Sequence, residues 1–252
     1  LDGQTVKSET NSPVMDGQAR QGPNRRMEYC GDVPDDFIYD PISRSSYTNL
    51  SSLYVRDDGT NSCYVEIPCT SATNGPADFT VELFVKANSE QRTTVSNALP
   101  AFKKARKDER GAAFEILVSC SGSPRRYNWL QTAVAPPCQE PRELSKNKYG
   151  GATHITDGRT WRHLALVYDA SNNIVKFYCD YELMATAPVS LPLAPLDAGP
   201  FLIGGQPHGR GLSGMIDEVR LSSLPLEPWQ FLRAMPKDTR DASFKPDASP
   251  AL

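Results

Sequence analysis

Alternation of apolar and polar residues is the clearest pattern in the chain, and it is strongest in residues 79–87. One face of this segment carries Phe79, Val81, Leu83, Val85 and Ala87, and the other carries Thr80, Glu82 and Lys86. A period of two places alternate side chains on opposite faces of a β-strand. The segment therefore predicts a half-buried strand.

Similar short runs recur through the middle of the chain and are separated by turn residues. Further strands are predicted at 63–67, 113–119, 126–134, 161–168, 174–179, 182–189, 201–204 and 214–221. The turn-forming sequence Asp169–Asn173 joins two of these runs and predicts a hairpin. Many strands with almost no helix indicate an all-β protein, built as a two-sheet antiparallel β-sandwich or jelly roll.

The ends of the chain and one internal stretch lack this alternation. We interpret residues 1–49 as an extended N-terminal arm, 50–234 as the sandwich and 235–252 as a polar C-terminal tail. Residues 88–112 interrupt the strands, and we interpret them as a solvated insertion. Its highly charged segment 101–110 is compatible with a short surface helix.

Four segments, in this order, resemble one family: 64–68, 79–86, 161–169 with 175–180, and 214–221. They are similar to the laminin-G-like, pentraxin-like jelly roll of concanavalin A-like proteins. This resemblance implies two antiparallel sheets, one concave and one convex, and a secreted protein. One departure is Tyr181, which stands where the family usually has a glycine, so we expect a different turn after Asp180.

Composition and charge exclude several classes of function. The chain has 252 residues, of which 39% are hydrophobic, and its formal net charge is -3. A strongly basic surface for nucleic acid is therefore not expected. No apolar run approaches the ~18 residues of a membrane span.

The cysteines bear on the compartment. Their even number, six, favours disulfides in an oxidising compartment over buried thiols, so we predict a secreted or extracytoplasmic location. Cys120 and Cys138 bracket a predicted hairpin and are the best candidates for a disulfide.

Catalytic residues are not evident. Glycoside hydrolysis needs two carboxylates at a fixed separation, and the Glu-x-Asp-x-x-Glu run of laminarinase-like members is absent. The nearest candidates, Asp217 and Glu218, are neighbours and are expected on opposite faces of a strand. We therefore predict that the protein is not an enzyme.

Asp217 is the most informative polar residue. Alternation in 214–221 places it on the same face as Val219 and Leu221, which we interpret as the apolar face. A carboxylate there must be hydrogen-bonded, paired with an arginine or bound to metal. The resemblance implies a structural Ca²⁺ near this position, and Asp57 and Asp58 are candidate partners because calcium prefers carboxylates.

These features support three hypotheses about function. The first is a non-catalytic extracellular binding module that recognises glycan or protein through the concave face or the rim loops. Tyr127 and Trp129 share one face of their strand and are candidate sugar-stacking residues. The second is a structural or accessory subunit of a larger assembly, favoured by the arm and the tail. The third is a divergent glycosidase.

Overall fold

A computed structural model gives the fold of the chain. It describes residues 5–6, 17–20, 26–56, 62–69, 78–87, 97–105, 112–120, 129–134, 142–145, 159–188, 199–207 and 211–236. Only the backbone is described for residues 5–6, 17, 26, 97–98, 112–113, 119–120, 129–134 and 142–145. Among all the residues that the structure describes, no helix is long and apolar enough to cross a membrane.

The described elements are almost all strands. In chain order they are β1 (Thr5–Val6), β2 (Gly17–Arg20), β3 (Arg26–Cys30), β4 (Phe37–Asp40), β5 (Ser45–Thr48), β6 (Ser52–Arg56), β7 (Tyr64–Ile67), β8 (Phe79–Ala87), β9 (Asn97–Ala105), β10 (Ala112–Cys120), β11 (Trp129–Val134), β12 (Arg142–Ser145), β13 (Arg162–Asp169), β14 (Ile174–Cys179), β15 (Glu182–Pro188), β16 (Phe201–Ile203), β17 (Gly214–Ser222), the 3₁₀ turn η2 (Pro228–Gln230) and β18 (Arg233–Met235).

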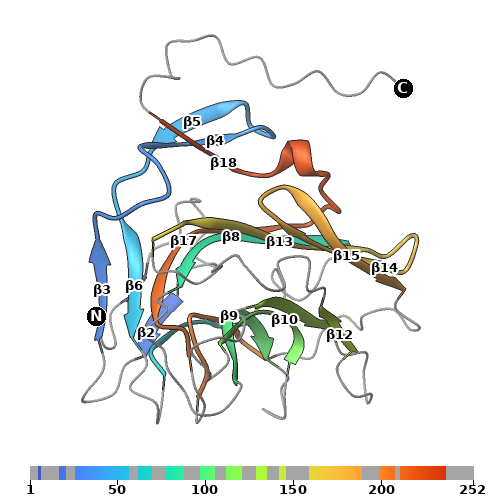
Figure 1. Cartoon of the computed structure of the whole chain (residues 1–252), viewed down its shortest axis with the longest axis horizontal. Helices are drawn as coiled ribbons and strands as arrows, with labels where there is room; N and C mark the ends of the chain where they lie inside the picture. The colour runs from blue at the N-terminus through green and yellow to red at the C-terminus, as the bar shows by residue number, and fades with distance from the viewer. Residues whose placement is uncertain are drawn as a thin grey trace.

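The strands form three antiparallel sheets. An eight-stranded sheet has the order β1-β2-β7-β16-β9-β10-β11-β12, a seven-stranded sheet has the order β15-β14-β13-β8-β17-β6-β3, and a three-stranded sheet has the order β18-β4-β5. Figure 1 shows the two large sheets stacked face to face, with the small sheet and η2 on the outside of the seven-stranded sheet. The predicted all-β sandwich and the hairpin of β13 and β14 are confirmed.

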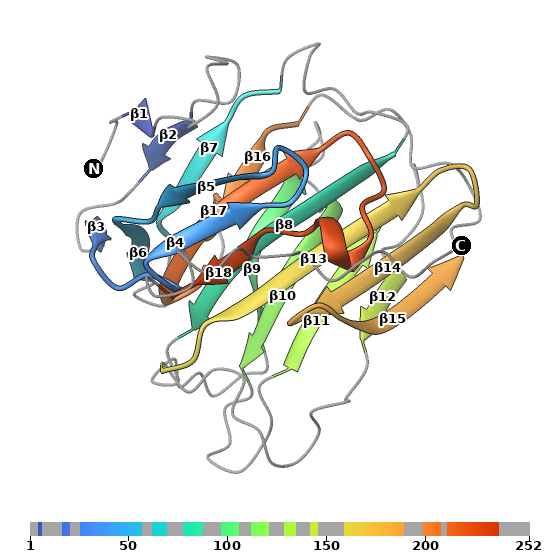
Figure 2. The same ribbon diagram turned by 90° about the horizontal axis from the view of Figure 1, so that it is seen from above.

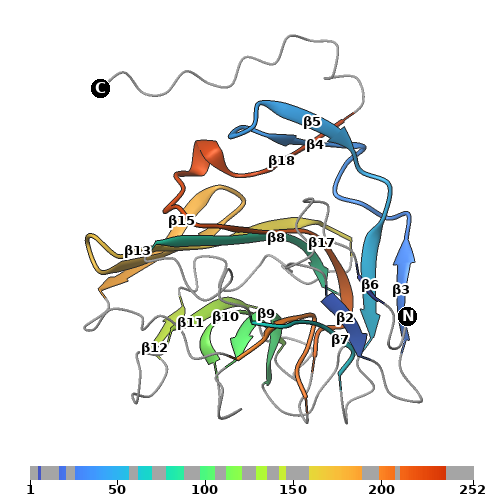
Figure 3. The ribbon, with the colours of Figure 1, turned by 180° about the vertical axis from the view of Figure 1, so that it is seen from behind.

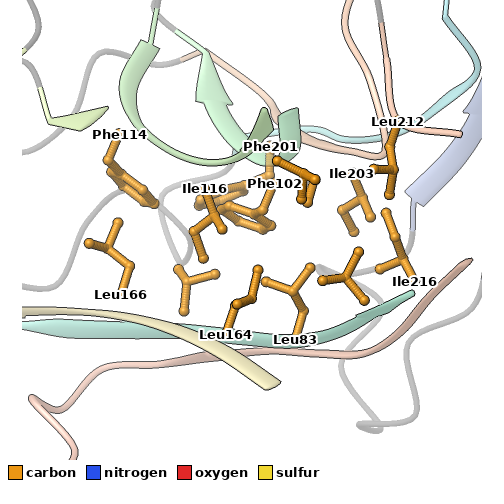
Figure 4. Packing of buried hydrophobic residues seen from close by; sticks show 14 of the residues in the cluster. Leu83, Phe102, Phe114, Ile116, Leu164, Leu166, Phe201, Ile203, Leu212 and Ile216 are labelled. Carbon is orange, nitrogen blue, oxygen red and sulfur yellow. The ribbon is translucent and has the colours of Figure 1, made fainter. Parts of the chain in front are cut away.

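Apolar side chains from the inner faces of the two large sheets form the main core. Figure 4 shows Phe102, Phe114, Ile116, Phe201, Ile203 and Leu212 on one side, facing Leu83, Leu164, Leu166 and Ile216 on the other. Each of these residues is at least nine-tenths buried. Each of the two large sheets therefore turns an apolar face inward, as the alternation of apolar and polar residues in the sequence predicts.

Strand β8 matches its predicted bounds, but the prediction that it is half-buried is wrong. All nine of its residues are buried, including Thr80, Glu82 and Lys86 on the polar face. The three-stranded sheet and the segment around η2 cover this outer face, as Figure 2 shows from above. Phe84, the one apolar residue on that face, packs against Ile38 and Leu232.

The predictions of a solvated insertion over 88–112 and of a surface helix over 101–110 are wrong for the described residues 97–105, which form β9. Strand β9 lies between β16 and β10 in the middle of the eight-stranded sheet. Pro100 is accommodated at an irregularity in the pairing with β10 and lies outside the stretch paired with β16. Lys104 is fully buried; its ammonium donates to the carbonyl of Gly199 and lies 4.2 Å from the centre of the Phe201 ring. Its long apolar stem lets it occupy a core-facing position.

The turn between β14 and β15 is tight although it contains no glycine. Asp180 and Tyr181 both have positive φ, 48° and 68°, as a two-residue type I′ hairpin turn requires. The Tyr181 ring stacks on His163 with centroids 4.6 Å apart, and its hydroxyl donates to the carbonyl of Leu232. Burial raises the pKa of the Tyr181 hydroxyl far above its usual value. Contacts with the outer layer therefore hold a tyrosine in a conformation that favours glycine.

Candidate functional site

The two large sheets differ in what their outer faces offer to a ligand. The outer face of the seven-stranded sheet is convex and lies beneath the three-stranded sheet, whereas Figure 3 shows the eight-stranded sheet curving with its hollow side turned away from the core. Polar side chains line this concave face along β2, β7, β9 and β10, because they alternate with the core residues of the same strands. The concave face is therefore the candidate site.

One end of the concave face is formed by β2 and β7. Arg20 is paired with Tyr64 across these strands, and both side chains lie opposite the core residues Ala19 and Val65. The Arg20 guanidinium donates to Glu66 Oε1 at 3.3 Å. Arg20, Tyr64 and Glu66 are all partly exposed, so this end offers a guanidinium, an aromatic ring and a carboxylate to a ligand.

The middle of the concave face is formed by β16, β9 and β10. A cross-strand row runs from Glu66 through Leu202 and Lys103 to Glu115. The Lys103 ammonium donates to Gln206 Oε1 at 2.6 Å. Burial lowers the pKa of Lys103, and the charge of Glu115 opposes this effect.

Gln206 is held in place by a loop that packs on Ser62. Its backbone N–H donates to Ser62 Oγ at 2.8 Å, and its carbonyl accepts from the same hydroxyl at 2.7 Å. A Cβ at Gly205 would overlap the Ser62 side chain, so the close approach requires glycine at this position. The side-chain amide of Gln206 is therefore presented beside Lys103 from a fixed backbone.

Among the described side chains, this arrangement combines hydrogen-bond donors and acceptors with the aromatic ring of Tyr64. Ammonium, guanidinium and amide groups donate, while the Glu66 and Glu115 carboxylates accept. Sugars present both hydroxyl donors and acceptors and an apolar ring face. The described side chains of the concave face therefore offer hydrogen bonds and a ring face to a ligand of this kind.

A second polar cluster lies on the convex face, beneath the outer layer. Glu82, with a side chain 0% exposed, accepts from Arg220 Nε at 2.6 Å, from His163 Nε2 at 2.8 Å and from the Leu232 N–H at 2.8 Å. Arg220 also donates to Asp40 Oδ1 at 2.7 Å. These contacts join β8, β13 and β17 to the outer layer, and their burial identifies a structural network rather than a binding surface.

Asp217 belongs to the convex side, so the prediction that it shares a face with Val219 and Leu221 is wrong. A bulge lies between Asp217 and Arg220, and Glu218 within it has a φ of 50°. The extra residue shifts the alternation, so Val219 and Leu221 pack on the core while Asp217 turns to the outer layer.

The same bulge overturns the expectation that Asp217 and Glu218 point to opposite faces. Asp217 Oδ2 accepts from Asn49 Nδ2 at 2.8 Å, and Glu218 Oε2 accepts from the Tyr47 hydroxyl at 2.5 Å. Both donors belong to β5 or follow it directly, so both carboxylates face the outer layer. Asn49 is buried beside this contact.

The predicted calcium site at Asp217 remains a prediction. Asp57 and Asp58 lie outside the described residues. β17 pairs with β6 over Gly214–Ile216. Asp217 follows one end of this paired stretch, and Arg56, the last described residue of β6, lies past the opposite end. Among the described residues, no group of three or more His, Cys, Asp or Glu side chains is placed to hold a metal.

Several other predicted site residues also fall outside what the structure describes. Tyr127 and Cys138 are not described, and for Trp129 and Cys120 only the backbone is, in the antiparallel pair β10 and β11. The predicted disulfide and the predicted stacking pair therefore stay predictions. The described cysteines, at positions 30, 63, 69 and 179, are thiols.

Lys103 and Gln206 were not predicted as site residues from the sequence. The charged run around Lys103 resembled a solvated helix, and Gln206 lies in a loop with no motif. The alternation of Leu99 and Ala101 before it was the available signal for a strand, but Pro100 and Phe102 obscured it.

Comparisons with known proteins agree with the fold. Over residues 58–230 the sequence matches the family described as the concanavalin A-like lectin/glucanases superfamily. No curated protein matches the sequence. Domain 4 of AbnA, a GH43 extracellular arabinanase from Geobacillus stearothermophilus in complex with arabinotriose, is 17% identical with a TM-score of 0.54. That likeness covers 86% of this chain and 90% of the arabinanase domain.

Two toxin domains have similar structures. The binding domain of botulinum neurotoxin serotype D has a TM-score of 0.50 at 13% identity, and that of Paraclostridial Mosquitocidal Protein 1 has 0.51 at 10% identity. The likenesses cover 90% and 89% of this chain, and this chain spans about half of each toxin domain, 49%. At such identities these structures show the fold alone, whereas the family match covers most of the chain. The chain belongs to the concanavalin A-like lectin/glucanase superfamily.

Proposed function

We propose that this protein is a non-catalytic, extracellular binding module that holds a saccharide on the concave face of its eight-stranded sheet. The observation that carries the proposal is the contrast between the two outer faces. The chain's own outer layer covers the convex face over β8, β13 and β17 (Figure 2), while the concave face offers the partly exposed Arg20, Tyr64 and Glu66 beside the more deeply placed Lys103.

The comparisons support a saccharide ligand and an extracellular location. The arabinanase domain of similar fold is part of an extracellular enzyme and was solved with arabinotriose.

The hypothesis of a subunit in a larger assembly was favoured by the N-terminal arm and the C-terminal tail, and it loses the first of these supports. The described strands of the segment 1–49 pair within this chain: β2 with β7, β3 with β6, and β4 with β5.

A glycan array followed by calorimetry tests the proposal. The array selects a saccharide, and calorimetry then compares its affinity for wild type, for one variant of the concave face and for one control variant. Tyr64→Ala is expected to weaken the binding of an array-selected saccharide by roughly three- to tenfold, because stacking on the ring is lost. Trp229→Ala is the control, since Trp229 is 46% exposed but lies in η2 on the opposite side of the molecule. Equal affinity in Tyr64→Ala and wild type, with a loss in Trp229→Ala, would place the ligand on the wrong face.

A further inference from the structure

Lys103 occupies the centre of the concave face and is unusually buried for a lysine in that position. Its strand β9 and the neighbouring β16 are the middle strands of the eight-stranded sheet. Lys103 is only 8% exposed, and its cross-strand neighbours on the same face are Leu202 and Glu115. Lysines are almost never buried to this extent unless they are paired.

Within the described part of the chain, Lys103 forms no ion pair. An ammonium has three N–H donors, and the acceptor described for Lys103 is the neutral amide oxygen of Gln206. Among the described residues, no carboxylate lies within ion-pair distance of it, although Glu115 is near enough to influence its pKa. Lys86 and Lys176, in contrast, pair with Asp32 and Glu227.

A buried ammonium whose described hydrogen-bond acceptor is neutral is costly, and a carboxylate ligand would relieve that cost. Taking an ion out of water is penalised by several kcal/mol unless a counter-charge and hydrogen bonds replace the lost solvation. Charge-assisted hydrogen bonds from an ammonium to a carboxylate are stronger than those to a neutral oxygen. We propose that the ligand of the concave face is an acidic saccharide whose carboxylate is bound by Lys103, an inference that rests on the proposed function.

The neighbouring charges favour a uronate-type sugar over an acidic peptide. Glu66 and Glu115 lie in the same cross-strand row as Lys103. These carboxylates accept hydrogen bonds from the hydroxyl groups of a sugar, which a peptide of acidic side chains lacks. Tyr64 supplies a ring face on which the sugar can stack. Arg20 is paired with Glu66 and adds a second positive charge to the concave face.

Calorimetry with charged and uncharged forms of one sugar tests the proposal. The probes are oligogalacturonate, an oligoglucuronate and an oligomannuronate, each beside its methyl ester, which removes the charge but keeps the rings and linkages. We expect at least one acid form to bind roughly tenfold or more tightly than its ester. Lys103→Met should abolish that preference, whereas Lys176→Met, which removes a lysine charge from β14, should keep it.

The outcomes separate this inference from the proposed function. If esters or neutral oligosaccharides bind as tightly as the acids, and Tyr64→Ala still weakens them, the acidic-ligand inference fails while the proposed function stands. If no saccharide binds at all, the proposed function fails as well. Preferential binding of a poly-glutamate peptide would show that the ligand class is wrong. Thermal melts of Lys103→Met must match wild type, and Lys103→Gln provides a second uncharged variant if they do not.

Discussion

Replacing Glu82 by Gln is expected to lower the free energy of unfolding by about 3–5 kcal/mol, because it breaks a buried ion pair by removing one partner. The Glu82 carboxylate is fully buried and accepts hydrogen bonds from Arg220, His163 and the Leu232 N–H. The neutral amide leaves Arg220 with one counter-charge, Asp40, and places an N–H₂ group among donors.

Urea denaturation at neutral pH measures this effect. A loss of this size corresponds to a fall in Tm of roughly 6–20 °C for a domain of this length. Glu227→Gln is the matched control because Glu227 forms an exposed pair with Lys176 at 3.4 Å, and its loss should change stability by less than about 1 kcal/mol. Equal effects of the two substitutions would contradict the assignment of Glu82 as the anchor of the outer layer.

Replacing Phe231 by Ala is expected to cost about 3–5 kcal/mol, the range for removing a buried aromatic side chain. Phe231 is 0% exposed and lies 5.2 Å from the Tyr178 ring and 5.5 Å from the His163 ring, measured between centroids. With Leu226 it packs against Ala165, Val167 and Tyr178 of the seven-stranded sheet.

Unfolding in urea and native-state hydrogen exchange together check this prediction. Trp229→Ala, two residues away in η2, removes an aromatic side chain that is 46% exposed and should have a much smaller effect. In Phe231→Ala, hydrogen exchange should rise first in β18, β4 and β5, because the outer layer loses packing contacts with the seven-stranded sheet. Exchange that rises evenly throughout the molecule would mean that the outer layer is not a separate unit.

The sandwich could be predicted because its main strands show the alternation of a one-sided core. Strand β8 has its predicted bounds, and β13 and β14 form the predicted hairpin. The third layer could not be predicted, because it joins two flanks that are distant in sequence, β4 and β5 with β18. Only that layer explains why Thr80 and Glu82, which alternate with core residues, are themselves buried.

Local irregularities account for the remaining errors. A bulge at Glu218 moved Asp217 to the other face, and such a shift has no signal in an alternation pattern read one strand at a time. Charged side chains concealed β9, since Lys104 faces inward through its apolar stem while Lys103 faces the concave side. The candidate site depended on that strand, so its central lysine could be found only after the sheet order was known.

Hydrogen exchange of the full chain with and without the array-selected saccharide tests the central claim most directly, namely that the ligand lies on the concave face. Bound saccharide is expected to slow exchange in β7, β9 and β10 and in residues 204–207, which carry or flank the candidate site. Exchange in β4, β5 and β18 should not change. Protection confined to β4, β5, β18 and residues 224–232, with none on the concave sheet, would contradict the account.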